Sequence, residues 1–518
     1  MSHKASQYVV NSRKVTHGGV FDPVSALPSL AHQKCLLFES ADVVTKLGEK
    51  SMLFFDIALK FESRNHQVAV TALLDEAQPI LKILSEAFQD QIVAHSRDTL
   101  TLRIEPLYHQ LDLLEKMRIP SALDVMRRTL SSAVLKDGEQ QKDFLLAGAF
   151  SYDFLDHFEK LPTAKCDRAE VPDYLFYLPL TLIIIDHKQQ ETSVIAHGLR
   201  GDDQDQAGRL AQAFDLVKSA TVARFELRSM QEPLAYRVDI SDDDFKHLVE
   251  RCKSHILAGD VYQIVPSRTF SMPIRDPIQC YQALRQLNPS PYMFYMKTDD
   301  WTLFGASPET FIKVETKKGG RRVSIRPIAG TRRRGFAEDG SIDDELDSRE
   351  QASLCLDEKE LAEHMMLVDL ARNDIASVAR PNSRRIKRLL SVDRFSHVMH
   401  LVSEVEGTLL KEFDALSAYQ ASMNMGTLMG APKVRSAELL RELEASKRGF
   451  YGGAVGYLDQ LGNMDTSIII RSALVKGDTA YVRAGCGVVY DSTPQFETQE
   501  TINKAEAVLR AIAMAGGL

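Results

Sequence analysis

The chain has 518 residues, a length typical of two domains or one large elaborated fold rather than a single compact core. Hydrophobic residues make up 44% and charged residues 26%, the composition of a globular enzyme and not of a disordered chain. The net charge of -8 argues against a broad nucleic-acid surface, because neutralising phosphates requires a basic face. An anionic small molecule is still compatible with this charge, since arginines in a cleft can reverse the local field.

The six cysteines stand singly along the chain, without the spacing of a zinc or redox motif, and nothing suggests a disulfide framework. Residues 1–7 lead into no apolar segment, so we expect no signal peptide. The most apolar stretch, 174–185, has 12 residues. This is shorter than the ~20 residues that span a bilayer, and it predicts a buried strand. We therefore expect a cytoplasmic protein that does not enter a membrane.

The N-terminal part predicts short buried strands joined by loops. Apolar, β-rich runs at 36–38, 52–55, 145–152 and 180–185 have the length and composition of strands. Between them, the pattern over 122–134 predicts an amphipathic helix.

A polar, helical stretch over 200–231 is broken at Pro233, and we place the domain junction there. The expected division is an N-terminal domain over 1–235 and a second domain over 236–518. Ser241, followed by three aspartates, predicts the start of a helix, because serine caps and the acids favour the positive end of the helix dipole. This helix should end near Gly259.

The second domain alternates further strands and helices. Strands are predicted over 261–265, 302–304, 310–314, 322–325, 396–407, 452–457, 467–474 and 479–490. The last two flank Lys476-Gly477-Asp478, a turn that indicates a hairpin. Helices are predicted over 358–370 and 499–513. Paired antiparallel strands with helices indicate the α+β class.

Two of these helices each carry a pair of glutamates on one face. Glu360 and Glu363 lie three residues apart in the first helix. Glu497 and Glu500 do so in the second, where Lys504 follows Glu500 by four residues. Mg²⁺ prefers oxygen ligands and keeps several waters, so one or two carboxylates from each helix would suffice. The alternative is two solvated helix faces, which are common for such patterns taken alone.

Two glycine-containing loops, 424–433 and 484–487, could present backbone N–H groups to an anionic substrate. Neither loop has the pattern of a Walker A or dinucleotide-binding motif. We interpret Cys486 as a small buried apolar residue and not as a nucleophile. A single histidine such as His400 is more often structural, although it can transfer protons near neutral pH.

Longer motifs over most of the second half resemble the chorismate-utilising enzymes. They are the segments 261–268, 288–292, 305–309, 327–331, 360–374, 399–401, 426–433 and 451–453. They span nearly all of residues 240–515 in order, and the segment 37–42 with Lys50 resembles the anthranilate synthase component I branch of the family. The resemblance implies an α+β fold with a large antiparallel β-sandwich core, flanking helices and an N-terminal regulatory region.

Two positions distinguish reactions within this family. Relatives that add water to chorismate carry a lysine base where this chain has Gln263, and an amide cannot deprotonate water. Aminodeoxychorismate synthases often carry a nucleophilic lysine where this chain has Ala329. Both residues favour direct attack by ammonia, and the resemblance then implies conversion of chorismate to anthranilate and pyruvate, the first step of tryptophan biosynthesis. The alternatives are an aminodeoxyisochorismate or aminodeoxychorismate synthase, a paralogue of secondary metabolism without tryptophan inhibition, and a catalytically inactive subunit.

The resemblance also implies a role for each matching residue. Glu309 would protonate the departing ring hydroxyl, and His400 would assist the loss of pyruvate, with Thr331 and Gln263 completing the catalytic set. Substrate would be bound by Gly330, Thr427, Tyr451, Arg471, Gly485, Gly487 and Lys504. Mg²⁺ would be held by Glu363 and Glu500, with Glu360 and Glu497 in its outer shell.

The resemblance further implies two partners besides chorismate. The chain lacks the Gly-x-Cys-x-Gly motif of a glutaminase, so a separate glutamine amidotransferase subunit would deliver ammonia within a hetero-oligomer, such as a heterotetramer. L-Tryptophan is implied as a feedback inhibitor, although Phe38 and Ser467 depart from the family pattern near its pocket. The implied tryptophan residues are Glu39, Ser40, Lys50, Pro291, Tyr292 and Met293.

Overall fold

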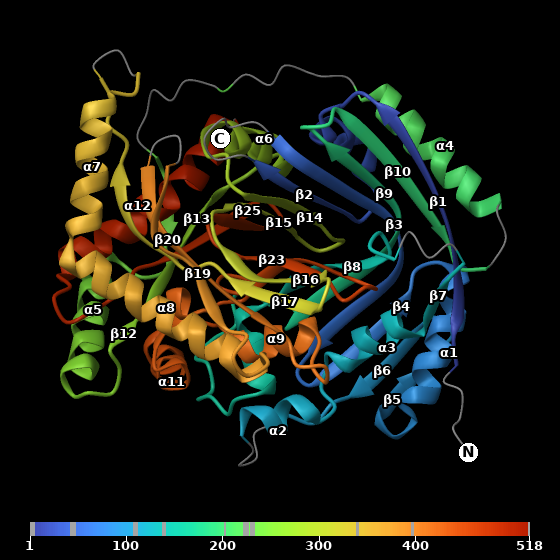
Figure 1. Cartoon of the computed structure of the whole chain (residues 1–518), viewed down its shortest axis with the longest axis horizontal. Helices are drawn as coiled ribbons and strands as arrows, with labels where there is room; N and C mark the ends of the chain where they lie inside the picture. The colour runs from blue at the N-terminus through green and yellow to red at the C-terminus, as the bar shows by residue number, and fades with distance from the viewer. Residues whose placement is uncertain are drawn as a thin grey trace.

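The computed structural model describes residues 6–41, 48–106, 112–136, 141–200, 204–220, 227, 234–337, 341–394 and 398–515. These residues form a two-layered β-sandwich with helices packed around it (Figure 1). Among the described strands, every pairing is antiparallel except that of β1 (Tyr8–Gly18) with β7 (Ala133–Leu135). The structure therefore confirms the predicted α+β class and its large antiparallel sheet.

Two long strands connect the layers. These are β3 (Gly48–Arg64) and β9 (Tyr174–Asp186), which pair with each other along most of their length. The first half of β3 pairs with β2 (Cys35–Ala41), and its second half pairs with β4 (Gln67–Ala72). The register shifts between Ile57 and Leu59, next to Asp56 with φ +52°. This bend lets one strand contribute to both layers.

Most of the other strands belong to one of the two layers. The layer around β2 contains β10 (Glu191–Gly198), β11 (Arg237–Val238), β13 (Ser267–Pro273), β14 (Tyr292–Lys297), β15 (Thr302–Ser307), β24 (Ser472–Lys476) and β25 (Thr479–Gly485). The layer around β4 contains β5 (Ile92–His95), β6 (Thr99–Arg103), β8 (Leu145–Phe150), β16 (Thr310–Lys317), β17 (Gly320–Ile325), β18 (Ile328–Arg333), β19 (Arg385–Arg394), β20 (Val398–Thr408), β22 (Ala454–Asp459) and β23 (Met464–Ile468).

Three large apolar clusters stabilise this arrangement. The one between the layers includes Phe54, Tyr177, Phe294 and Trp301. Helices cover the outer faces and bury the other two clusters. The helices are α1 (Gln78–Ala87), α2 (Leu113–Arg118), α3 (Asp124–Ser132), α4 (Gln204–Ser219), α5 (Asp242–Leu257), α6 (Pro277–Leu287), α7 (Asp344–Leu356), α8 (Glu358–Val378), α9 (Ala415–Ser422), α10 (Gly426–Met429), α11 (Lys433–Leu443) and α12 (Pro494–Met514). Short 3₁₀ segments lie at η1 (Pro23–Leu30), η2 (Asp75–Ala77), η3 (Gln89–Gln91) and η5 (Tyr152–His157).

Predictions based on local signals are confirmed. The N-terminal strand predictions correspond to β2, β3, β8 and β9, and the helix over 122–134 corresponds to α3. The hydroxyl of Ser241 accepts a hydrogen bond from the Asp244 N–H at 3.2 Å and caps α5, as expected. Gly259 follows this helix with φ +81°, a conformation that glycine adopts without strain.

Several predicted boundaries were wrong. The segment 261–265 contains only a two-residue strand, β12 (Gln263–Ile264), which pairs with β21 (Gly430–Ala431). The predicted strand over 467–474 is divided into β23 and β24, because Arg471 has φ +51° and cannot continue a strand. The strand predicted over 479–490 ends at Gly485. Helix α8 continues to Val378, and α12 begins earlier than expected.

The two sequence halves share their sheets. β2 pairs with β14, and β8 pairs with β22, so N-terminal strands hydrogen-bond to C-terminal ones in both layers. The boundary at 235–236 stays a prediction. The predicted residues 396–397, and 201–203, 221–226 and 228–231 within the polar stretch, lie outside the described residues. None of the helices in the described part of the chain is long and apolar enough to cross a membrane.

Candidate active site

His400 lies in β20 opposite Thr331 of β18. Its Nδ1 atom is 3.0 Å from the carbonyl oxygen of Gly330 and 3.0 Å from Oγ1 of Thr331. A carbonyl oxygen only accepts, so Nδ1 carries the hydrogen and donates it. Burial lowers the pKa of His400 to about 4, so the imidazole is neutral near pH 7. The ring is thus fixed in the tautomer whose Nε2 is the basic nitrogen.

Gly330 makes this geometry attainable. It has φ +70° and lies where the β18–β20 register shifts between Ala329 and Thr331. A Cβ atom here would lie 3.0 Å from Cδ1 of Leu354 and 3.2 Å from Oε2 of Glu360. The position therefore requires glycine both for its backbone angle and for the close approach of α8.

Gln263 of β12 contacts Glu363 of α8. The amide Nε2 of Gln263 donates to Oε1 of Glu363 at 3.0 Å, and Gln263 itself is only 2% exposed. A Cβ atom on Gly487 would lie 2.8 Å from that amide nitrogen and 3.4 Å from the Glu363 oxygen, so all three residues meet. Burial, together with the charges of Glu360 and Glu500, raises the pKa of Glu363.

Helix α12 contributes the second acidic pair. Glu497 is 1% exposed, and burial raises its pKa, with the nearby Glu500 adding to the effect. Although burial opposes it, Lys504 holds the pKa of Glu500 below its ordinary value, with Nζ 2.7 Å from Oε1. Lys504 Nζ also donates to the carbonyl oxygen of Gly485 at 3.1 Å. Glu497 is thus buried and Glu500 half-buried, and this face of α12 meets the 484–487 loop through Lys504.

Glu309 lies between β15 and β16 and is 5% exposed. Burial raises its pKa to about 8, an effect that the nearby Thr427 hydroxyl, the Ile328 backbone and Lys504 only partly offset. The side chains of Glu309 and Thr427 lie close together, yet within the described residues neither Oε1 of Glu309 nor Oγ1 of Thr427 has a hydrogen-bond partner of ordinary geometry. Two buried polar atoms without partners, one of them on a neutral carboxyl group, are typical of a site built to meet a ligand.

Arg471 and Tyr451 also lie at the site. Nη1 of Arg471 donates to the carbonyl oxygen of Lys504 at 2.7 Å, and its positive charge contributes to the low pKa of His400. A Cβ atom on Gly485 would lie 3.1 Å from the hydroxyl oxygen of Tyr451. The structure therefore brings together the predicted catalytic, substrate and acidic residues, from strands and helices up to 241 residues apart in sequence. Their individual roles stay predictions.

The acidic pairs offer oxygen ligands on two facing helices, but they do not form a closed metal cage. Among the described residues, no three histidine, cysteine or carboxylate side chains converge in a ligating arrangement. Mg²⁺ commonly uses only one or two protein carboxylates together with waters and substrate oxygens. Oε2 of Glu497 and Oε1 of Gln263 are buried oxygens without a hydrogen-bond partner in the described structure. This donor set fits a hydrated Mg²⁺ ion that is completed by substrate.

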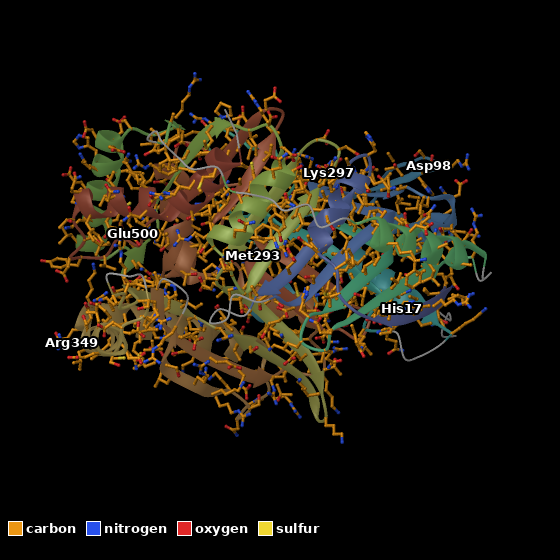
Figure 2. All side chains as sticks on the ribbon, turned by 90° about the horizontal axis from the view of Figure 1, so that it is seen from above. His17, Asp98, Met293, Lys297, Arg349 and Glu500 are labelled. Carbon is orange, nitrogen blue, oxygen red and sulfur yellow. The ribbon has the colours of Figure 1, made fainter. Side chains whose placement is uncertain are left out.

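The residues predicted for tryptophan line a different cavity. Its volume is about 110 Å³, and its walls include Glu39, Ser40, Lys50, Pro291, Tyr292 and Met293. Phe38 and Ser467, the two departures from the family pattern, line it as well. Figure 2 shows Met293 well apart from Glu500 in α12, so a ligand here would act at a distance from the acidic site.

The carboxylate of Glu39 is the most constrained group of this cavity. It accepts hydrogen bonds from the Tyr281 hydroxyl at 2.6 Å and from Nη2 of Arg285 at 2.9 Å. The hydroxyl of Ser51 donates to it at 3.2 Å. Since Arg285 also binds Asp22, α6 and η1 are both connected to this wall of the cavity.

Comparison with known proteins assigns the chain to a family. The family model described as chorismate binding enzyme matches residues 73–510. The chain belongs to this family. Within it, anthranilate synthase component 1 of Vibrio cholerae serotype O1 is 44% identical over 95% of this chain and 94% of its own length. The pyocyanine-specific anthranilate synthase component 1 of Pseudomonas aeruginosa is 45% identical over 93% of this chain and 90% of its own. The chain is thus a member of the anthranilate synthase component 1 group.

Solved structures agree with this assignment. Anthranilate synthase component I from Streptococcus pneumoniae superposes with a TM-score of 0.68 at 30% identity, covering 89% of this chain and 92% of that one. The menaquinone-specific isochorismate synthase from Escherichia coli has a TM-score of 0.67 over 99% of this chain and 96% of that one. At 16% identity, this second likeness shows the shared fold alone.

Sequence reasoning missed one group next to the site. Glu444, Arg448 and Arg483 form a buried ion cluster beside the substrate residues. The spacing of four residues between Glu444 and Arg448 is a weak signal of an ion pair. Arg483 lies 35 residues further on, and nothing in its sequence context points to the other two.

Proposed function

We propose that this chain is the aminating component of an anthranilate synthase, which converts chorismate and ammonia to anthranilate and pyruvate in the first step of tryptophan biosynthesis. The hydrogen bond between Gln263 and Glu363 carries the proposal, because it places an amide, and not a base, beside the acidic site. An amide cannot activate water, whereas ammonia already has an available lone pair. The names of the relatives at 43–44% identity support the same reaction.

Glu309 would supply the proton for the first step. Because burial raises its pKa to about 8, the carboxyl group is neutral at physiological pH and can donate a proton to the departing ring hydroxyl. Ammonia adds to the ring as this oxygen leaves. Thr427, whose hydroxyl lies close to Glu309, would orient either the acid or the leaving oxygen.

His400 would take part in the second step. Its Nδ1–H is held by the Gly330 carbonyl oxygen, so Nε2 is the atom that can accept the ring proton while pyruvate departs. The lowered pKa of about 4 keeps the imidazole neutral, with Nε2 unprotonated, over the working pH range. Thr331, 3.0 Å from the same Nδ1 atom, helps to fix the ring orientation.

The substrate's two carboxylates would be bound at separate places. Arg471 would pair with the enolpyruvyl carboxylate through charge-assisted hydrogen bonds, aided by Tyr451 and the backbone at Gly487. Lys504, held by Glu500 and by the Gly485 carbonyl oxygen, would complete the pocket floor.

Glu363 and Glu500 would hold Mg²⁺, and Glu360 and Glu497 would orient its waters. When bound there, the ion would neutralise the ring carboxylate of chorismate, as the largest local charge in the site. The burial of Glu497, the half-buried carboxylate of Glu500 and the unpaired oxygens of Glu497 and Gln263 support this assignment.

A separate glutamine amidotransferase subunit would supply the ammonia in a hetero-oligomer, since the relatives are named as component 1 of their enzymes. We also place the protein in the cytoplasm, consistent with its six free cysteines. Ammonium salts at alkaline pH should replace the partner subunit, because free ammonia is the nucleophile.

L-Tryptophan would inhibit the enzyme from the 110 Å³ cavity. The observation that supports this second function is that all six residues predicted for tryptophan line that one cavity. The competing assignment is a secondary-metabolism paralogue such as the pyocyanine-specific relative. Inhibition of the purified chain by micromolar L-tryptophan supports the primary pathway, and unchanged turnover at millimolar L-tryptophan contradicts the inhibitor site.

The test of the main proposal is product analysis with the purified chain, chorismate, Mg²⁺ and ammonium at alkaline pH. We expect anthranilate fluorescence that requires both ammonium and Mg²⁺. A product that retains the enolpyruvyl group would indicate an aminodeoxyisochorismate or aminodeoxychorismate synthase. No consumption of chorismate, together with retained binding of a glutaminase, would indicate an inactive subunit.

A further inference from the structure

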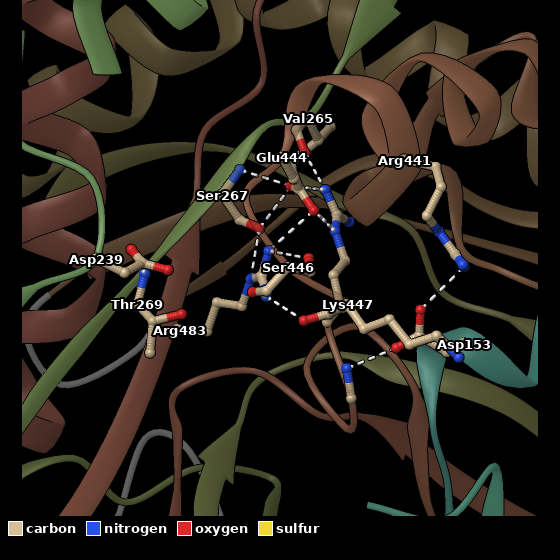
Figure 3. A network of polar contacts seen from close by, with 12 residues as sticks. Asp153, Asp239, Val265, Ser267, Thr269, Arg441, Glu444, Ser446, Lys447 and Arg483 are labelled. Atoms are coloured by element: carbon tan, nitrogen blue, oxygen red, sulfur yellow. Dashed lines mark hydrogen bonds and ion pairs between the residues drawn. The ribbon is translucent and has the colours of Figure 1, made fainter. Parts of the chain in front are cut away.

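A buried ion cluster lies directly behind the substrate-facing residues. Glu444 follows α11 and is 4% exposed, Arg448 is 4% exposed, and Arg483 of β25 is 9% exposed. Both guanidinium groups bind the same carboxylate, with Nη2 of Arg448 2.6 Å from Oε1 and Nη2 of Arg483 2.9 Å from Oε2. Figure 3 shows Glu444 at the centre of this network, with Ser267 and Arg483 beside it.

The single carboxylate of the cluster lies between two positive charges. Although burial opposes it, Arg448 and Arg483 hold the pKa of Glu444 below its ordinary value, so the carboxylate is ionised. Glu444 also accepts hydrogen bonds from the backbone N–H and the hydroxyl of Ser267, at 2.9 and 2.8 Å. Every strong acceptor position of the carboxylate is therefore used.

Arg448 connects this cluster to the segments that carry site residues. Its Nη2 donates to the carbonyl oxygen of Val265, two residues after Gln263, at 2.5 Å. Its Nη1 donates to the carbonyl oxygen of Leu428, the residue after Thr427, at 2.5 Å. The guanidinium group of Arg448 thus fixes the distance between the segment that carries Gln263 and the segment that carries Thr427.

The same side chain supports Tyr451. The guanidinium carbon of Arg448 lies 5.9 Å from the centre of the Tyr451 ring and 4.5 Å from that of Tyr152. Arg483 continues the network by donating to the carbonyl oxygen of Lys447 at 2.7 Å, and it lies two residues before Gly485. Four substrate-facing segments therefore meet at three charged residues that do not themselves belong to the predicted catalytic set.

We propose that Arg448, held in place by Glu444 and Arg483, is a positioning residue that sets the alignment of Gln263, Thr427 and Tyr451 for the reaction. This inference rests on the proposed function. Arg448 acts through the two backbone carbonyls and the tyrosine ring, and not through contact with the reacting atoms. A displacement of ~1 Å in such a site is enough to lower turnover ~10²-fold.

A cavity gives external molecules access to this cluster. It has a volume of about 300 Å³, and Arg448, Arg483, Ser446 and Tyr451 contribute to its lining. If Arg448 is truncated to alanine, a small cation can therefore reach the vacated position without unfolding the protein. Guanidinium matches the missing group in shape and charge, whereas urea matches its shape alone.

The first experiment compares Arg448→Lys with a matched control, Arg209→Lys. Arg209 of α4 likewise binds a buried carboxylate, that of Glu76, and a backbone carbonyl oxygen, that of His197 at 3.0 Å, but it contacts none of the site segments. Lysine keeps the charge but cannot bind two carbonyls and a carboxylate in one plane. We expect kcat/KM for chorismate to fall ~10²-fold in Arg448→Lys and less than ~2-fold in Arg209→Lys, with similar losses of thermal stability.

The second experiment measures Arg448→Ala with low millimolar guanidinium chloride or urea. We expect guanidinium, and not urea, to restore part of kcat. Equal activities of the two lysine variants at matched stability would overturn the proposal, as would equal effects of guanidinium and urea on a folded alanine variant. If the alanine variant does not fold, the lysine pair decides alone. Turnover is followed as chorismate consumption, so a wild-type chain that consumes chorismate without making anthranilate contradicts only the proposed reaction.

Discussion

The buried carboxyl group of Glu309 gives the sharpest single prediction. Glu309→Gln keeps the shape of the side chain and removes the transferable proton. We expect turnover of chorismate to fall by ~10²–10⁴-fold, the usual contribution of a general acid. Binding of chorismate should change little, because the amide still fills the same space.

The same substitution has a pH-dependent effect on stability. In the unfolded chain a glutamate ionises near pH 4.5, whereas burial raises the pKa of Glu309 in the folded protein to about 8. Below pH 4.5 both states carry the neutral acid, and its contribution to stability is fully present. Between pH 4.5 and 8 the unfolded chain ionises first, so the folded wild type progressively loses stability, and above pH 8 the loss is complete.

The size of this loss follows from the shift in pKa. At about 1.4 kcal/mol for each tenfold change in proton affinity, the raised pKa of Glu309 corresponds to at most about 5 kcal/mol. Glutamine does not titrate, so the variant escapes this loss. We therefore expect the variant to be no more stable than wild type at pH 5 and several degrees more stable at pH 9.

The assay is a series of thermal unfolding midpoints for wild type and Glu309→Gln from pH 5 to pH 9. The difference between the two proteins should grow up to about pH 8 and then become constant. A difference that stays flat over this range would show that Glu309 ionises normally and is not a neutral general acid at physiological pH.

Three further predictions concern the second step, the metal and the inhibitor. The His400→Ala variant should still aminate chorismate but release little pyruvate, because the proton-accepting Nε2 is gone. Mass spectrometry should show an aminated intermediate, and unchanged anthranilate output would remove the histidine from the mechanism. Glu363→Gln should need at least ~10-fold more Mg²⁺ for half-maximal rate, which a Mg²⁺ titration after chelator treatment will measure; an unaltered requirement would place the ion elsewhere. Glu39→Ala removes the acceptor that binds Tyr281 and Arg285, so inhibition by L-tryptophan should weaken ~10-fold, equivalent to ~1.4 kcal/mol of binding. The rate of the variant without tryptophan should match that of wild type, and equal inhibition of both proteins would show that tryptophan binds at another site.

Local sequence signals were sufficient where the structure is determined locally. Ser241 and the aspartates after it define the start of α5, and Gly259 follows its end. The division between β23 and β24 could not be predicted in this way. Arg471 has no local reason to adopt φ +51°, and its side chain donates a hydrogen bond to α12, far along the chain.

The arrangement of the active site, likewise, could be predicted from the sequence only in part. Glutamate spacing identified the two acidic helix faces, but spacing alone could not show that they face inward, and the resemblance to known enzymes was needed to select them. Gln263 lies 100 residues before Glu363, so their contact at 3.0 Å depends on the packing of β12 against α8. The cluster of Glu444, Arg448 and Arg483 was missed because its carbonyl partners are backbone groups, which leave no trace in the side-chain pattern.

The most direct test of the proposed reaction uses ¹⁵N-ammonium, chorismate and Mg²⁺ with the purified chain alone. We expect ¹⁵N-labelled anthranilate and pyruvate in equal amounts, with no hydroxylated product, because Gln263 cannot activate water. Isochorismate or salicylate without incorporated nitrogen would contradict the proposed reaction.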